Sequence, residues 1–159
     1  MTALTEGSPA PEIDLPTDNG GHFRLSDSKG EKVLVYFYPK DDTSGCTKES
    51  CSFSENIKSF EKIGCKIVGI SKDSVKSHDK FKAKYDLQFP LASDQDGDVC
   101  ERYGTWVQKS MYGRKYMGIE RTTFLIDENG TIQKIWPKVS VTGHTEEILA
   151  ELNGKARAA

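Results

Sequence analysis

Two apolar runs of strand length, separated by a helical pattern, constrain the fold of this chain more than any other feature of its sequence. The runs are VLVYFY at 33–38 and CKIVGIS at 65–71. Nearly continuous runs of β-branched and aromatic residues are typical of strands covered on both faces of a sheet. Between them, from about residue 46 to residue 63, apolar residues recur every three or four positions: Phe53, Ile57, Phe60 and Ile63. This spacing predicts a helix ended by Gly64, and a right-handed crossover between two parallel strands.

The rest of the chain continues the alternation of strands and helices. We expect a short edge strand among polar connections at 20–32, an exposed helix at 74–87, and a short strand, a turn and a short helix at 89–104. An Asn-Gly turn predicts a hairpin at 121–137, and TEEILAELN at 145–153 predicts a closing helix. Together these elements predict one α/β domain over residues 1–159, with a central mixed sheet flanked by helices.

Cys46 lies where such a fold places its functional sites. It follows the first buried strand at the start of the predicted helix, and ligands of open α/β sheets bind beyond the carboxyl ends of the strands. A helix N-terminus offers unpaired N–H groups and a partial positive charge, which lower the pKa of a cysteine from ~8.5 to ~3.5–7.5. Since nucleophilicity falls with pKa, thiolate formation alone accelerates a reaction only about a few-fold. Groups that bind the substrate and stabilise its developing charge should therefore lie nearby.

Charge and composition exclude several other classes of protein. A formal net charge of −2 argues against a nucleic-acid-binding protein. The longest apolar run is far shorter than the ~20 residues of a membrane helix. Residues 1–16 have neither the basic start nor the apolar segment of a signal peptide, so we expect a soluble, cytoplasmic protein.

The cysteines do not have the spacing of a metal site. Cys46, Cys51, Cys65 and Cys100 form no C-x2-C pair, and the histidines lie at no ligand spacing from them, so we expect no bound metal. In a reducing compartment, such cysteines are buried core residues or reactive thiols. Cys65 opens a buried strand and is expected to be a core residue.

The segment around Cys46 resembles a known family. Pro39, Thr43 and Cys46 form a P-x-x-x-T-x-x-C pattern, and Cys51 extends it to G-C-T-x-E-x-C. The pattern is similar to the signature of the peroxiredoxins, thiol peroxidases on a thioredoxin-like fold, and specifically to their bacterioferritin comigratory protein branch, also called peroxiredoxin Q. The similarity runs from about residue 7 to residue 152 and includes PAPEIDLP, YGRKYMGIERTTFLIDENG and GHTEEILAEL.

The resemblance implies a role for each residue of the motif. Cys46 matches the peroxidatic cysteine, whose thiolate attacks a peroxide oxygen and becomes a sulfenic acid. Thr43 matches the threonine whose hydroxyl bridges thiolate and peroxide, and Pro39 matches the proline that shields the pocket from water. The backbone N–H groups of Gly45 and Cys46 would complete the peroxide site. The residues alone also allow Thr43 to be only a helix cap.

Two charged residues would complete the pocket. Arg121 matches the arginine that stabilises the thiolate and the transition state, and Glu49 occupies the position of the carboxylate that commonly holds this arginine. Without the motif, Arg121 would be an ordinary surface cation. Ser44 departs from the branch, which often has proline here, so the loop could be looser or Ser44 could cap the helix.

Cys51 is the expected resolving cysteine, and Cys100 is the alternative. On one regular helix, the Cα atoms of Cys46 and Cys51 would lie roughly 8–9 Å apart. Because a disulfide tolerates at most ~7 Å, the first turns of the helix must unwind before the bond can form.

The resemblance implies a peroxidase that needs no bound cofactor and reduces hydrogen peroxide or organic hydroperoxides. It would form an intramolecular disulfide and be recycled by thioredoxin or a similar dithiol; this branch is often monomeric. One alternative is a thiol–disulfide oxidoreductase on the same fold, although such proteins favour C-x-x-C spacing. The other is a non-enzymatic, redox-responsive holdase. It would use four apolar residues at the basic segment YGRKYMG: Met111, Tyr112, Tyr116 and Met117. We expect this segment to be a solvated loop.

Overall fold

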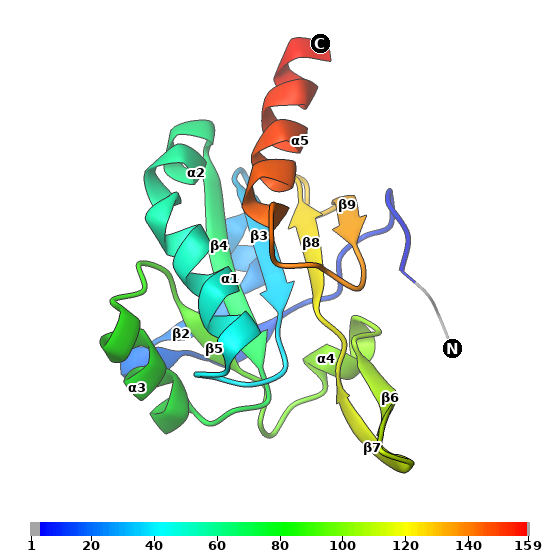
Figure 1. The fold of residues 1–159 in the computed structure, drawn as a ribbon. Coiled ribbons are helices and arrows are strands. Elements are labelled where there is room, and N and C mark those ends of the chain that lie inside the picture. The colour runs from blue at the N-terminus through cyan, green and yellow to red at the C-terminus, as the bar shows by residue number, and fades with distance from the viewer. Residues whose placement is uncertain (1–3, 159) are drawn as a thin grey trace.

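A five-stranded mixed sheet forms the centre of the computed structural model, which describes residues 4–158 (Figure 1). In spatial order, the strands are β5 (Leu91–Ser93), β4 (Cys65–Ser71), β3 (Lys32–Phe37), β8 (Thr122–Ile126) and β9 (Ile132–Trp136). β3, β4 and β5 are parallel, whereas β8 is antiparallel to both of its neighbours, β3 and β9. The predicted α/β class, the parallel β3–β4 pair and the β8–β9 hairpin are therefore confirmed.

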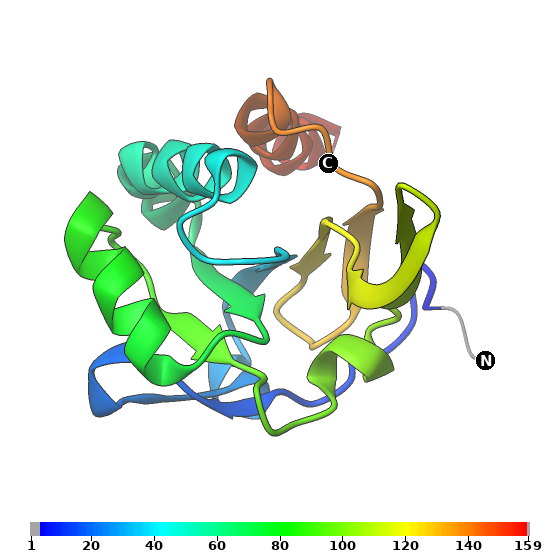
Figure 2. The same cartoon turned by 60° about the horizontal axis from the view of Figure 1, so that its bottom comes forward.

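Helices and the N-terminal segment cover the two faces of this sheet (Figure 2). One face carries α1 (Ser44–Glu55), α2 (Ile57–Ile63) and α5 (His144–Ala158), with α3 (Val75–Tyr85) on the side of β5. The other face carries α4 (Val99–Arg102) and the N-terminal elements β1 (Asp14–Pro16), η1 (Asp18–Gly20), β2 (His22–Arg24) and η2 (Leu25–Ser28). Within residues 4–158, no helix is long and apolar enough to span a membrane.

The two faces bury separate apolar cores, which explains the uninterrupted apolar run of β3. Because side chains alternate along a strand, Val33, Val35 and Phe37 enter one core, which also contains Cys100. Leu34, Tyr36 and Tyr38 enter the other core, which contains Cys46. Every residue from 33 to 38 is at most 1% exposed.

The single helix predicted over 46–63 is wrong: the structure has two helices. α1 ends at Glu55, and Asn56 leaves helical geometry with φ −104° and ψ 14° before α2 begins. The Asn56 side-chain amide donates a 2.8 Å hydrogen bond to the Ser52 carbonyl. Asparagine favours such breaks because its side chain competes for backbone hydrogen bonds. Gly64 ends α2 in the left-handed conformation (φ 80°), as predicted.

The basic segment 112–118 is not a loop, which is a second correction. β6 (Trp106–Met111) and β7 (Arg114–Ile119) pair as a hairpin that projects from the body of the molecule (Figure 1). Its turn, Tyr112–Gly113, has positive φ at both residues (52° and 78°), as in the type I′ turns that suit the twist of hairpins. The four apolar residues near this turn are exposed: Met111, Tyr112, Tyr116 and Met117.

Candidate active site

The sheet topology brings Arg121 to Cys46, although 75 residues separate them in the sequence. β8 is antiparallel to β3, and Thr122 pairs with Phe37 at the last position of β3. The residue that precedes β8 therefore lies at the carboxyl edge of β3, where α1 begins. From there Arg121 donates from Nη2 to Cys46 Sγ (3.3 Å) and from Nη1 to Glu49 Oε1 (2.6 Å). The structure thus brings together three of the predicted site residues, Cys46, Glu49 and Arg121.

Cys46 lies in the first turn of α1 and is buried, with 1% of its surface exposed. The Thr47 N–H donates to the Thr43 carbonyl (2.8 Å) as the helix begins. The N–H groups of Gly45 and Cys46 precede that bond, so helix geometry gives them no intrahelical acceptor. A Cβ atom at Gly45 would lie 3.2 Å from Arg121 Nη2, so glycine at this position leaves room for the guanidinium. The start of α1 therefore combines the positive charge of Arg121 with two backbone hydrogen-bond donors, the N–H groups of Gly45 and Cys46.

Thr43 and Pro39 lie on the loop that joins β3 to α1, and both are exposed. Thr43 occupies the N-cap position, but its hydroxyl does not bond to the helix. Instead, Oγ1 donates to the Lys40 carbonyl (2.8 Å), which ties the end of the loop to its middle. The Thr43 side chain therefore does not cap the helix. Ser44 does not occupy the cap position either, because it is the first residue of α1.

Glu49 is almost fully buried one helical turn after Cys46, with 1% of its surface exposed. Its Oε1 accepts the bond from Arg121, whereas its Oε2 has no hydrogen-bond partner among the residues that the structure describes. Burial raises the pKa of Glu49 to about 7, and the nearby Arg121 charge offsets this only in part. The carboxyl group thus holds a proton more tightly than an exposed glutamate does.

Cys51 lies on the same helix as Cys46, in its third turn, and is half-buried. Burial raises the pKa of its thiol, and the neighbouring Glu55 carboxylate raises it further. All four cysteines are free thiols in this structure. In this helical form, Cys51 is therefore a protonated thiol held away from Cys46 by regular helix geometry.

Cys100 and Cys65 are buried core residues. Cys100 belongs to the core on the opposite face of the sheet from Cys46, and burial together with the Asp94 carboxylate raises the pKa of its thiol strongly. Cys65 opens β4, and burial raises its pKa to about 12. Neither thiol is activated in the folded protein.

The sequence reasoning missed the residues that hold the loop between β3 and α1. Asp41 and His78 are both buried and lie against each other, and Asp73 bonds the loop backbone. The sequence did contain an indication that His78 is buried. It precedes Phe81 by three residues in the predicted helix, so both side chains lie on the same face, which is buried in the structure. Among residues 4–158, no group of three or more His, Cys, Asp or Glu side chains is arranged to hold a metal ion.

Comparison with known proteins finds peroxiredoxins among the relatives of this chain. The AhpC/TSA family model matches residues 7–135. The putative peroxiredoxin bcp of Coxiella burnetii is 56% identical over 150 residues, which cover 94% of this chain and 99% of that protein. The peroxiredoxin Bcp of Bacillus subtilis is 44% identical over 146 residues, which cover 92% and 93% of the two chains.

Solved structures give the same result. The crystal structure of a mutant of Xylella fastidiosa PrxQ superposes with a TM-score of 0.92 at 37% identity and covers 98% of this chain and 99% of that one. The Xanthomonas campestris bacterioferritin comigratory protein, described for its alkyl peroxide reduction activity, superposes with a TM-score of 0.86 at 42% identity, covering 91% and 92%.

Proposed function

The chain belongs to the AhpC/TSA family and to its Bcp, or peroxiredoxin Q, branch, and from this membership we propose that Cys46 is the peroxidatic cysteine. Membership establishes a thioredoxin-like fold and thiol peroxidase activity, that of an antioxidant oxidoreductase. The roles of single residues, the disulfide and the reductant are the parts that we propose.

One observation carries the assignment of the site. The Arg121 guanidinium bridges Cys46 Sγ and the buried Glu49 carboxyl, at the N-terminus of α1. A cation and a helix N-terminus both stabilise negative charge, first on the thiolate and then on the peroxide oxygens. The other cysteines lack this environment: Cys65 and Cys100 are buried in the apolar cores, and Cys51 lies beside Glu55.

In the first step, the Cys46 thiolate attacks one peroxide oxygen and the O–O bond breaks. Cys46 becomes a sulfenic acid, and the departing hydroxide or alkoxide takes up a proton to give water or an alcohol. Arg121 and the N–H groups of Gly45 and Cys46 stabilise the charge on the oxygens, the Thr43 hydroxyl bridges thiolate and peroxide, and Pro39 shields the pocket. Glu49 holds Arg121 in place.

Hydrogen peroxide and organic hydroperoxides are the proposed substrates. The Xanthomonas campestris relative is described for alkyl peroxide reduction, which supports the organic class. In a second step, the Cys51 thiol condenses with the sulfenic acid, forming the disulfide and releasing water. Thioredoxin or a similar dithiol then reduces the disulfide and is itself oxidised.

The fold favours Cys51 over Cys100 as the resolving thiol. Cys46 and Cys51 share one helix, so unwinding a few turns of α1 frees both sulfur atoms. Cys100 is separated from Cys46 by the sheet itself, because the two cysteines belong to cores on its opposite faces. A Cys46–Cys100 bond would require the sheet to open.

The proposal is tested by following peroxide consumption in the presence of thioredoxin, thioredoxin reductase and NADPH. The wild type should oxidise NADPH in proportion to added peroxide, whereas Cys46→Ser should consume peroxide no faster than a free thiol. A Cys46→Ser protein that retains rapid turnover would overturn the assignment. Consumption without any client protein also separates a peroxidase from a holdase that would use the exposed β6–β7 hairpin.

A further inference from the structure

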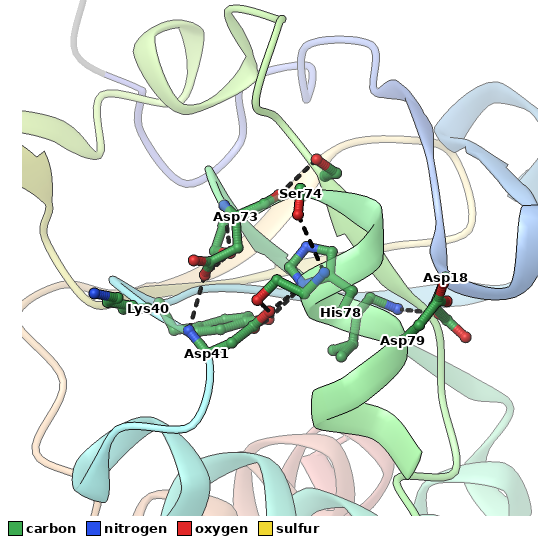
Figure 3. Close-up of polar contacts among 12 residues, drawn as sticks. Asp18, Lys40, Asp41, Asp73, Ser74, His78 and Asp79 are labelled. Atoms are coloured by element: carbon green, nitrogen blue, oxygen red, sulfur yellow. Dashed lines mark hydrogen bonds and ion pairs between the residues drawn. The ribbon is translucent and has the colours of Figure 1, made fainter. Parts of the chain in front are cut away.

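The loop between β3 and α1, residues 38–43, is held by a buried polar cluster that the reaction scheme above does not use. Its centre is Asp41, which is 8% exposed. Asp41 Oδ1 accepts a hydrogen bond from the Tyr38 hydroxyl (2.6 Å), and Oδ2 accepts one from the Ser77 hydroxyl (2.8 Å). His78 Nδ1 lies 2.7 Å from Oδ2 (Figure 3). Ser77 and His78 belong to α3, so the cluster ties the loop to that helix.

The partners of His78 define where its protons are. His78 is 0% exposed, and its Nε2 lies 3.1 Å from the carbonyl oxygen of Ala92. A carbonyl oxygen only accepts, so Nε2 carries a proton. On the other side, both Asp41 oxygens accept from hydroxyl groups, which is the pattern of a carboxylate, and we assign the proton between Oδ2 and Nδ1 to the ring nitrogen. With this assignment the pair is a buried imidazolium and carboxylate, each satisfied by hydrogen bonds.

Three further hydrogen bonds hold the same loop, one through the backbone of Asp41 and two through the side chain of Asp42. The Asp41 N–H donates to Asp73 Oδ2 (2.8 Å), and Asp73 lies in the turn before α3 (Figure 3). The next residue, Asp42, has a positive φ of 57° and accepts bonds from Lys84 Nζ (2.8 Å) and the Tyr85 hydroxyl (2.6 Å). α3 and the turn before it therefore hold the loop at two consecutive residues, Asp41 and Asp42.

The hydrogen bonds that Asp41 and Asp42 make to α3 and to the turn before it form a clamp on the loop. This clamp is connected directly to the catalytic residues. Thr43 donates to the Lys40 carbonyl on one side, and its own carbonyl accepts from Thr47 in the first turn of α1 on the other. Cys46 lies only five residues after Asp41. A displacement of Asp41 therefore moves both the Thr43 hydroxyl and the start of the helix that carries the thiolate.

We propose that the Asp41–His78 pair is a positioning device for the peroxide reaction, which holds Thr43 at the site and sets the N-terminal limit of the segment that unwinds when Cys46 and Cys51 form their disulfide. The proposal rests on the proposed peroxidase function. Loosening the clamp should affect the two steps in opposite directions. The reaction with peroxide becomes slower because the site is less ordered, and disulfide formation becomes faster because α1 unwinds more readily.

The protonation of His78 is tested first, by nitrogen-15 NMR of the imidazole at pH 7, a measurement that is independent of peroxidase activity. Both ring nitrogens of the wild type should be protonated. In Asp41→Asn, the new amide can donate to Nδ1, so Nδ1 should lose its proton while Nε2 keeps its own. An unprotonated Nδ1 in the wild type would overturn the assigned pair.

The positioning role is tested by rapid mixing of peroxide with His78→Gln and Asp41→Asn. Either variant should lower the second-order rate constant for peroxide by about tenfold and raise the rate of disulfide formation. Asp41→Asn keeps the shape of the side chain, which gives a second readout if His78→Gln does not fold. The matched control is Lys82→Met, which removes a 2.9 Å ion pair between α3 and the buried Asp18 without touching the loop.

The outcomes separate the two proposals. Unchanged rate constants in a folded loop variant, or equal changes in Lys82→Met, would overturn the positioning role and leave the peroxidase intact. A wild type that does not react with peroxide would overturn the proposed function, while the NMR result on the pair would stand.

Discussion

The Arg121 guanidinium lies between Cys46 and Glu49, with Nη2 3.3 Å from Cys46 Sγ and Nη1 2.6 Å from Glu49 Oε1. This relationship joins the residue that precedes β8 to the first two turns of α1, and it gives the thiol a fixed cationic partner. Electrostatic stabilisation of this kind is commonly the largest single contribution to catalysis.

Arg121→Ala should lower the second-order rate constant for peroxide by about 10²–10³, comparable to the loss of an oxyanion-hole donor. If Arg121 acts on the transition state, raising the pH will not restore the rate, since a fully formed thiolate would still lack its partner. Stopped-flow measurements from pH 5 to pH 9 test this. Arg102→Ala, which removes a surface pair with Asp98, is the control. Full recovery at high pH would show that Arg121 only promotes thiolate formation.

Gly45→Ala should lower the same rate constant, but by less than Arg121→Ala. The added Cβ would lie 3.2 Å from Arg121 Nη2 and would displace the guanidinium slightly from Cys46. Gly154→Ala is the matched control, because a Cβ there would meet no atom within 4 Å and alanine favours the helix. Equal rates for Gly45→Ala and the wild type would mean that the close approach has no kinetic consequence.

The stability of the wild type relative to Glu49→Gln should depend on pH. Burial raises the pKa of Glu49 from 4.5 to about 7, so between these values the folded state binds more protons than the unfolded state. The free energy of unfolding contributed by Glu49 therefore falls as the pH rises from about 4.5 to about 7, and it is constant above that window. Urea unfolding of both proteins at pH 4.5, 6 and 8 measures this. A difference that does not vary with pH would be inconsistent with the raised pKa.

Cys51→Ser should react once with peroxide at the wild-type rate but fail to turn over with thioredoxin. Its sulfenic acid has no resolving partner, so excess peroxide should convert it to sulfinic acid. Cys100→Ser should retain turnover, because Cys100 lies on the other face of the sheet. In the oxidised wild type, non-reducing peptide mapping should find a Cys46–Cys51 bond, and amide exchange should be faster in residues 44–54. Turnover by Cys51→Ser together with a Cys46–Cys100 bond would transfer the resolving role to Cys100.

The sequence allowed the prediction of the features that depend on local patterns. The apolar runs of β3 and β4 predicted buried strands because both faces of the sheet are covered. The motif around Cys46 indicated the candidate site, and the family resemblance of the segment that begins at Arg121 indicated its arginine. The break at Asn56 was missed because the apolar spacing continues through it, whereas the break comes from side-chain bonding to Ser52. The β6–β7 hairpin was missed because its exposed strands bury no single face, which removes the alternating pattern, and because tyrosine is an unusual residue in a turn with positive φ.

The contacts between distant segments could not be predicted from one sequence. Asp41 and His78 are 37 residues apart, and only the packing of α3 against the end of β3 brings them together. The separation of Cys46 from Cys100 also depends on which face of the sheet each helix covers. Local spacing leaves that choice open, which is why the resolving cysteine had an alternative.

The central claim is that peroxide oxidises the sulfur atom of Cys46. It is tested most directly by a single-turnover experiment on Cys51→Ser. The variant is mixed with one equivalent of hydrogen peroxide, the sulfenic acid is trapped with dimedone, and the adduct is located by mass spectrometry. We predict one adduct per chain, on Cys46, and its loss in the Cys46→Ser/Cys51→Ser double variant. An adduct on Cys65 or Cys100, or none on Cys46 after peroxide is consumed, would contradict the account.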